Sequence, residues 1–175
     1  MLISLTRLGV SRAILLTDNA FAGSDTLATA YALSLAVKRI QPDLIVCGRQ
    51  SVDGDTAQVG PSLAAMLSLP VITNVMELRN VGETVDCVTR LGEETAPLPA
   101  VITVERGYTL RFPSLRSKIG QVEILNAQDI GADISKCGLR GSPTRVLRTY
   151  ESTAGRRKCE FITPDELTEV IEIGR

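Results

Sequence analysis

The sequence contains no histidine and no tryptophan among its 175 residues, and aromatic residues make up only 3% of it. Without histidine, the chain cannot form a Ser-His-Asp triad, a Cys-His pair or a histidine metal site. So few aromatic side chains also argue against a base-stacking platform for nucleic acid. The net charge is −1, so no strong field draws the chain to nucleic acid or to an anionic membrane. Hydrolytic catalysis and nucleic-acid binding are therefore not expected.

The four cysteines are scattered, and no two of them form a C-x-x-C pair. This spacing predicts neither a zinc or iron–sulfur site nor a disulfide framework. The first residues contain no basic segment followed by an apolar run, and no apolar run is long enough to span a bilayer. We expect a cytoplasmic protein without a membrane-spanning segment.

The residues that are present are typical of a globular α/β domain, with 44% hydrophobic and 22% charged residues. Short apolar or alternating runs predict strands at 13–16, 44–47, 71–75, 84–91 and 100–104. Helices are expected over 2–8, from a cap at 24 or 25 to about 40, through 62–67, and from 163 through 171. The third helix has two possible starts, a cap at Asp55 or Pro61 as its first residue.

The order of these elements points to one fold class. Strands and helices alternate first, and a strand-rich stretch follows. This order predicts an α/β fold with a mostly parallel sheet and an antiparallel extension. Residues 1–125 are expected to form this domain, and residues 126–175 an extended arm that ends in a short helix.

Two loops leave the carboxyl ends of expected parallel strands, where ligands bind in open α/β sheets. The first loop ends in Ser24, Asp25 and Thr26. Small polar groups and free N–H donors at a helix start can hold an anion such as a pyrophosphate. The same residues are also ordinary helix caps, and that alternative stays open here.

The second loop runs from Gly48 to Gly60 and contains the chemistry of a nucleotide site. Gly48 and Gly54 let the backbone approach a ligand closely. The amides of Gln50 and Gln58 can hydrogen-bond an adenine edge, a ribose or an isoalloxazine ring. The carboxylates that can bind ribose hydroxyls are Asp53 and Asp55. A simple turn has a similar composition, and no P-loop or G-x-G-x-x-G motif is present.

Four segments resemble motifs of the electron transfer flavoprotein beta subunit, in the same order along the chain. Cys47–Pro61 resembles the family's signature loop, and Leu16–Thr29 is similar to the motif before it. Arg111–Arg116 and Gly138–Thr144 match two later motifs. Together these segments extend over nearly the whole chain.

The resemblance implies a three-layer fold of the Rossmann-like, adenine nucleotide α-hydrolase-like type, with helices on both faces of the sheet. It implies an electron-carrier subunit, and not a self-sufficient enzyme, in the cytoplasm of a bacterium or an archaeon. The beta subunit of the family pairs with an alpha subunit. The heterodimer passes electrons from a dehydrogenase, such as an acyl-CoA dehydrogenase, to downstream acceptors, or bifurcates electrons from NADH.

The resemblance also implies the cofactor site. In simple carriers the stretch matching 48–59 holds AMP, and in bifurcating members it holds a second FAD. The Asp53–Gln58 stretch and the Asp25-Thr26-x-x-Thr29 pattern are closer to the bifurcating type, so FAD is expected rather than AMP. The implied cofactor-binding residues are Asp18, Ser24, Asp25, Thr26, Thr29, Gly48, Arg49, Gln50, Ser51, Val52, Asp53, Gly54, Asp55, Thr56, Ala57, Gln58 and Val59.

Two departures from the family pattern lead to further expectations. The family's strand–helix–strand start has no counterpart here, so we expect a truncated or mis-started subunit that binds nucleotide weakly or not at all alone. Sub-micromolar binding of FAD or AMP in a titration would contradict this. The family's dehydrogenase-docking loop matches the shortened segment 105–110, with Leu110 as its apolar anchor. The arm 126–175 is expected to pack on the alpha subunit.

One alternative belongs to another class of protein. A stand-alone adenine-nucleotide-binding regulatory module, resembling the universal stress proteins, has a similar α/β layout. It requires a glycine-rich phosphate loop late in the chain, and Gly138–Ser142 only faintly resembles one. The visible spectrum after co-expression with an alpha subunit separates the two, because only the flavoprotein would be coloured.

Overall fold

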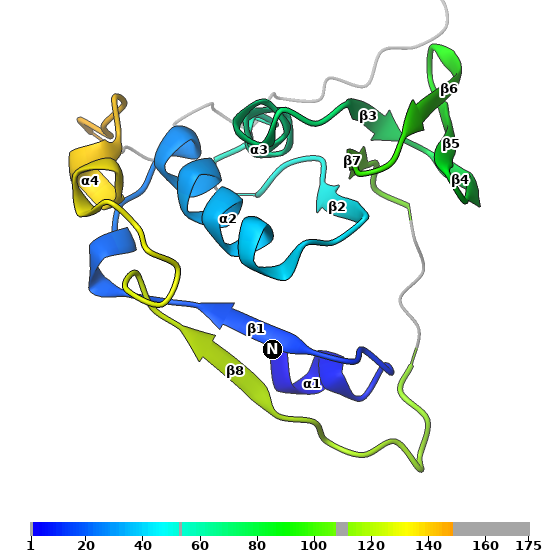
Figure 1. Ribbon diagram of the computed structural model, residues 1–175, viewed down its shortest axis with the longest axis horizontal. Coiled ribbons are helices and arrows are strands. Elements are labelled where there is room, and N and C mark those ends of the chain that lie inside the picture. Colours follow the sequence, from blue (N-terminus) through cyan, green and yellow to red (C-terminus); the bar gives the residue numbers. More distant parts are fainter. Residues whose placement is uncertain (1, 53, 108–111, 149–175) are drawn as a thin grey trace, which may run out of the picture. The chain divides into compact units, whose positions relative to one another are not determined.

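The computed structural model describes residues 2–52, 54–107 and 112–148. The chain divides into two units, residues 1–145 and 146–175, and the first unit contains every element named below (Figure 1). The helices are α1 (Leu2–Thr6), α2 (Thr26–Ile40), α3 (Val59–Leu67) and α4 (Gly138–Gly141), with 3₁₀ turns η1 (Asn19–Phe21) and η2 (Ile134–Lys136). The strands are β1 (Ala13–Leu16), β2 (Leu44–Gly48), β3 (Val71–Val75), β4 (Glu77–Val81), β5 (Thr84–Thr89), β6 (Gly92–Pro97), β7 (Ala100–Val104) and β8 (Val122–Leu125).

The parallel strands form two sheets in the described part of the chain. One sheet has the order β2-β7-β3, and the other pairs β1 with β8. Helix α2 connects β1 to β2, and α3 connects β2 to β3, so strands and helices alternate as the sequence predicts. The α/β class is therefore confirmed, although its parallel strands are divided between two sheets.

An antiparallel meander, β4-β5-β6, follows β3 and forms the expected antiparallel extension. The sequence predicts β5 but not its neighbours. Every side chain of β4 is exposed, and β6 buries only Ala96, so neither strand shows an apolar alternation. Periodicity finds a strand only when one of its faces is buried.

The central strand β7 separates two hydrophobic clusters. Consecutive strand residues point to opposite faces of a sheet. Val101 packs with Leu63 of α3 and Ile45 of β2, whereas Ile102 packs with Val85 and other residues of the meander. The meander therefore covers one face of the β2-β7-β3 sheet, and α3 and α2 cover the other.

Helix α2 begins at Thr26 with Asp25 as its N-cap, which settles the choice between Ser24 and Asp25. It ends where Gln41 adopts a left-handed conformation (φ 53°) directly before Pro42. One side of α2 packs with the cluster around Val101, and the other packs with Leu125 of β8. The helix thus contributes to the cores of both parallel sheets.

Helix α3 begins at Val59, with Gln58 before it, so neither expected start is correct. Pro61 is the third helical residue. It is tolerated there because the first amides of a helix have no intrahelical acceptor, so the missing N–H of proline removes no bond. The helix predicted from 163 through 171 lies outside the described residues, and the boundary predicted at residue 125 stays a prediction.

One edge of β2 pairs with no other strand of the described chain. The Asp43 carbonyl accepts from the Ala100 amide at 3.1 Å, and the Arg49 amide donates to the Val104 carbonyl at 3.0 Å. Backbone groups alternate in direction along a strand, so those of the even-numbered residues 44, 46 and 48 face away from β7. The side chain of Val46 is 57% exposed.

Candidate functional site

A cleft of about 420 Å³ lies at the carboxyl end of β2. Three segments form it: the start of α2, the loop after β2 and the first turn of α3. Its lining residues are Thr26, Leu33, Cys47, Gly48, Arg49, Gln50, Ser51, Gly54, Thr56, Ala57, Gln58, Val59 and Gly60. The carboxyl end of a parallel strand is where α/β sheets bind ligands, so the cleft is the candidate functional site.

Helix α2 contributes a polar and an apolar residue to the cleft. The hydroxyl of Thr26 donates to Oε1 of Gln58 at 3.1 Å, which joins the start of α2 to the loop before α3. Leu33 follows two turns later on the same helical face. Thr29 lies on that face between them and is half-buried, but it does not line the cleft.

The first turn of α3 presents backbone N–H groups to the cleft. Gln58 precedes the helix without a side-chain capping bond, and the first amides of a helix have no intrahelical acceptor. They form the positive end of the helix dipole. Gly60 is buried here, and it lies so close to β7 that a Cβ at this position would overlap the methyl group of Thr103. The glycine thus lets the helix start lie directly against the sheet.

The loop between β2 and α3 is held by its own side chains. Gln50 donates to the Asp55 carboxylate, and the Gly54 amide donates to the Ser51 hydroxyl at 3.3 Å. Asp55 and Ala57 have positive φ values, 49° and 55°, which residues other than glycine adopt rarely. The loop therefore holds a defined conformation that costs on the order of 1 kcal/mol or more per strained residue.

An ion pair links the cleft to the residue that follows β7. The Arg49 guanidinium donates to both carboxylate oxygens of Glu105, at 3.0 and 3.2 Å, and the Glu105 side chain is 12% exposed. Burial alone raises the pKa of Glu105, but the hydrogen bonds and charge of Arg49 outweigh it and leave that pKa below its ordinary value. Glu105 is therefore an anion at neutral pH, and its charge is offset by Arg49.

Two residues expected to bind cofactor form hydrogen bonds that hold the protein's own loops. The Asp18 carboxylate accepts from the amides of Ala20 at 2.9 Å and Ala127 at 3.1 Å, and these bonds lower the pKa of Asp18. The Ser24 hydroxyl donates to the Phe21 carbonyl at 2.7 Å and accepts from the Gly138 amide at 3.1 Å. Neither side chain lines the cleft.

Asp25 is similarly occupied. One carboxylate oxygen accepts from the amides of Leu27 and Ala28, both at 3.0 Å, and the other from the amide and hydroxyl of Thr144, at 3.1 and 2.8 Å. Burial raises the pKa of Asp25, but these hydrogen bonds outweigh it and lower the pKa. Asp25 thus caps α2 and fixes the segment after α4.

The structure brings most of the expected site residues together. Those that line the cleft are Thr26, Gly48, Arg49, Gln50, Ser51, Gly54, Thr56, Ala57, Gln58 and Val59. Val52 and Asp55 belong to the loop but do not line the cleft, and Asp53 and Leu110 lie outside the described residues. Sequence reasoning missed Leu33, Cys47 and Gly60. Each had a signal, because Cys47 and Gly60 lie within the segment that resembles the signature loop, and Leu33 lies at helical spacing from Thr26.

Residues 2–52, 54–107 and 112–148 contain neither a metal-binding cluster nor a membrane-spanning helix. In these segments no three His, Cys, Asp or Glu side chains gather in a way that could hold a metal ion. No helix there is long and apolar enough to cross a membrane.

The chain is similar to one protein family and to several individual proteins. The model of the electron transfer flavoprotein domain matches residues 4–130. Protein FixA of Azorhizobium caulinodans is 43% identical over 88% of this chain and 61% of its own length. The electron transfer flavoprotein subunit beta of Thermoanaerobacterium thermosaccharolyticum is 38% identical over 94% of this chain and 66% of its own length.

A third relative gives the same result. The electron transfer flavoprotein subunit beta of Megasphaera elsdenii is 39% identical over 82% of this chain and 59% of its own length. The chain thus spans 59–66% of the length of these three curated relatives. The four motifs and these matches agree, and the chain belongs to the electron transfer flavoprotein beta-subunit family.

Proposed function

We propose that this chain is the nucleotide-holding part of an electron transfer flavoprotein beta subunit. Its cleft would bind the adenine nucleotide portion of FAD, with AMP in its place if the protein is a simple carrier. The observation that carries the proposal is the cleft at the end of β2, whose lining matches the family's signature loop. The family match also favours this function over a stand-alone regulatory module.

The groups in the cleft suit a nucleotide. The Gln58 amide nitrogen is not used by the bond to Thr26, so it can donate to an adenine or ribose acceptor. The Ser51 hydroxyl and the first amides of α3 can donate to phosphate oxygens. Among the described residues, no atom lies within 4 Å of the place where a Cβ of Gly48 would be, so ligand atoms can approach this backbone.

The size of the cleft suits part of a dinucleotide. Its volume of about 420 Å³ is near the lower end of small-molecule pockets, which run from about 300 to 1,000 Å³. An adenosine monophosphate moiety is common to AMP and FAD, so the cleft can serve either ligand. The preference for FAD rests on the motif pattern around Asp25 and on the Asp53–Gln58 stretch of the sequence.

Bound flavin would supply the redox chemistry, and the chain would supply binding and position. In this proposal the chain pairs with an alpha subunit and receives electrons from a dehydrogenase. The expected anchor, Leu110, lies outside the described residues. The adjoining described segment contains Phe112 and Leu115, which are 95% and 100% exposed. With Arg116 and Lys118 beside them, these side chains suit an apolar partner surface with an acidic rim.

Binding to the assembled protein tests the proposal. The chain is co-expressed with an alpha subunit, and the affinities for FAD and AMP are measured by isothermal titration after removal of bound nucleotide. Gln58→Leu keeps the side-chain volume but removes the amide, so we expect at least tenfold weaker binding. Gln128→Leu is the matched control, because Gln128 is exposed in a turn and does not line the cleft.

The flavin content distinguishes the two carriers. Two FAD per heterodimer support the bifurcating type, and one FAD with one AMP supports the simple carrier. Unchanged FAD and AMP affinities in the Gln58→Leu protein would show that the nucleotide lies elsewhere.

A further inference from the structure

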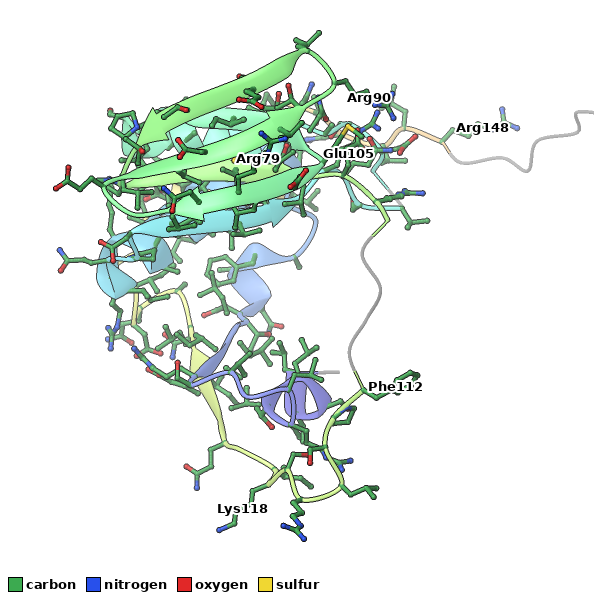
Figure 2. The ribbon with its side chains drawn as sticks, turned by 90° about the vertical axis from the view of Figure 1, so that its right-hand side faces the viewer. Arg79, Arg90, Glu105, Phe112, Lys118 and Arg148 are labelled. Carbon is green, nitrogen blue, oxygen red and sulfur yellow. The ribbon has the colours of Figure 1, made fainter. Side chains whose placement is uncertain are left out.

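A second, smaller cavity lies beyond the Arg49–Glu105 ion pair. Its volume is about 190 Å³, and it is lined by Met76, Arg90, Glu105, Arg106 and Gly107. These residues follow β3, β5 and β7, so the cavity opens where two parallel strands reach their carboxyl ends. Figure 2 shows Arg90 and Glu105 close together at one end of the strands, away from Arg79 on the meander.

The charges around this cavity are unbalanced. Among the described residues of its lining, Glu105 is the single carboxylate, and Arg49 already donates to both oxygens of that carboxylate. Arg90 acts on Glu105 only through space, and Arg106 adds another guanidinium to the lining. Within the described residues, neither Arg90 nor Arg106 has a carboxylate within ion-pair distance. Two like charges thus face one small space without a direct counter-ion.

The chemistry of the lining indicates which ligand fits. Each guanidinium is a planar fork that donates two hydrogen bonds to an oxyanion, and phosphate offers enough oxygens for two forks. Gly107 (φ 132°) adds a stretch of backbone with no side chain, and no atom of the described residues lies within 4 Å of the place where its Cβ would be. A phosphate group would also relieve the repulsion between the two arginines.

We propose that Arg90 and Arg106 form a second anion subsite, which binds a phosphate group beside the nucleotide cleft. The subsite rests partly on the proposed function, because it shares the Arg49–Glu105 pair with the cleft. The phosphate can belong to the far half of a dinucleotide whose adenosine lies in the cleft, or it can be a separate anion.

Binding of inorganic pyrophosphate to the full chain is the direct test. Titration is followed by the ³¹P resonance of pyrophosphate at low ionic strength, where screening is weak. We expect Arg90→Gln and Arg106→Gln each to weaken binding at least fivefold. Arg79→Gln is the matched control: its guanidinium pairs with Glu93 on the meander and does not line the cavity. Equal weakening in all three proteins would indicate a general charge effect and overturn the subsite.

The cleft variant separates this proposal from the proposed function. If Gln58→Leu weakens pyrophosphate binding and Arg90→Gln does not, the anion enters the cleft and the subsite is wrong. If Arg90→Gln weakens pyrophosphate binding while FAD and AMP fail to bind any variant of the assembled protein, the subsite stands and the proposed function falls.

The source of the phosphate follows from the nucleotide affinities. Arg90→Gln should weaken FAD but not AMP if the subsite holds the second phosphate of the dinucleotide. It should leave both affinities unchanged if the anion is a separate ligand. Both results support the subsite, provided that pyrophosphate binding is lost in the same variant.

Discussion

Gly48 and Gly60 both line the cleft, but their surroundings differ. A Cβ at Gly60 would overlap the Thr103 methyl group, whereas a Cβ at Gly48 would meet no atom within 4 Å in the part of the chain that the structure describes. We therefore expect Gly60→Ala to lower the free energy of unfolding by about 1–3 kcal/mol, as overpacking commonly does. Gly48→Ala should change it by less than about 0.5 kcal/mol. Urea denaturation followed by circular dichroism measures both.

A second substitution tests the cause. Thr103→Ser removes the methyl group but keeps the hydroxyl, which accepts from the Asn74 amide at 3.0 Å. Gly60→Ala should therefore lower the free energy of unfolding much less in the Thr103→Ser protein than in the original protein. If the two effects simply add, the contact with Thr103 is not the cause.

The site residues show what a sequence pattern can and cannot predict. Thr26, Gln58 and the glycine at 48 are where the loop pattern places them, because a strand end followed by a helix start fixes their positions. Asp18 and Ser24 do not line the cleft, and a carboxylate or hydroxyl that caps a turn has the same sequence signature as one that binds a ligand. Only the fold shows that their acceptors are already occupied.

The N-cap of α2 makes the stability of that helix depend on pH. The pKa of Asp25 is lower in the folded chain than in the unfolded chain. The Asp25 carboxylate therefore stabilises the fold fully at pH values above its unfolded pKa of about 4. This stabilisation is lost as the pH falls through the pKa of the folded chain. Replacing the cap by alanine typically costs about 0.5–2 kcal/mol. We expect Asp25→Ala to lower the free energy of unfolding by this amount at pH 7 and by less at pH 3.

Asparagine provides the matched control for this cap. Asp25→Asn keeps an oxygen that accepts from Leu27 and Ala28, so it should lose less stability than Asp25→Ala. Its side chain does not titrate, so this position should no longer contribute to the pH dependence. Urea titrations at pH 7 and pH 3 measure these differences. A penalty for Asp25→Ala that is the same at both pH values would rule out the carboxylate as its source.

Whole elements were predicted where burial shapes the sequence. The apolar run 100–104 predicts β7 because both faces of that strand are covered. The run 44–47 predicts β2, and the polar caps predict the start of α2. The first residue of α3 could not be predicted, because Gln58 forms no capping bond and therefore carries no capping signature.

The edge of β2 that no described strand covers affects the behaviour of the whole molecule. Backbone amides that bond to β7 are protected from exchange with solvent, and those that face the open edge are not. By this alternation, the amides of Leu44, Val46 and Gly48 should exchange faster than those of Ile45 and Cys47. Hydrogen–deuterium exchange followed by NMR on the chain alone measures the two sets.

The control is to measure the protection of these amides at several protein concentrations. An exposed edge is also a template for pairing with another chain. If Leu44, Val46 and Gly48 are as well protected as their neighbours in dilute solution, a further strand covers the edge within one chain. If protection appears only at high concentration, the edge is open and associates between molecules.

The distance along the chain between paired strands also suggests an order of folding. In the meander, Val88 pairs with Glu93 through a tight hairpin, whereas in the sheet Leu44 pairs with Ala100 only after a long stretch of chain has been closed into a loop. Because closing a long loop costs more entropy, we expect the meander to form before β2 joins β7. The carboxyl end of β2, which lines the cleft, would then be among the last parts to assemble. A nucleotide bound there would slow unfolding far more than it speeds folding.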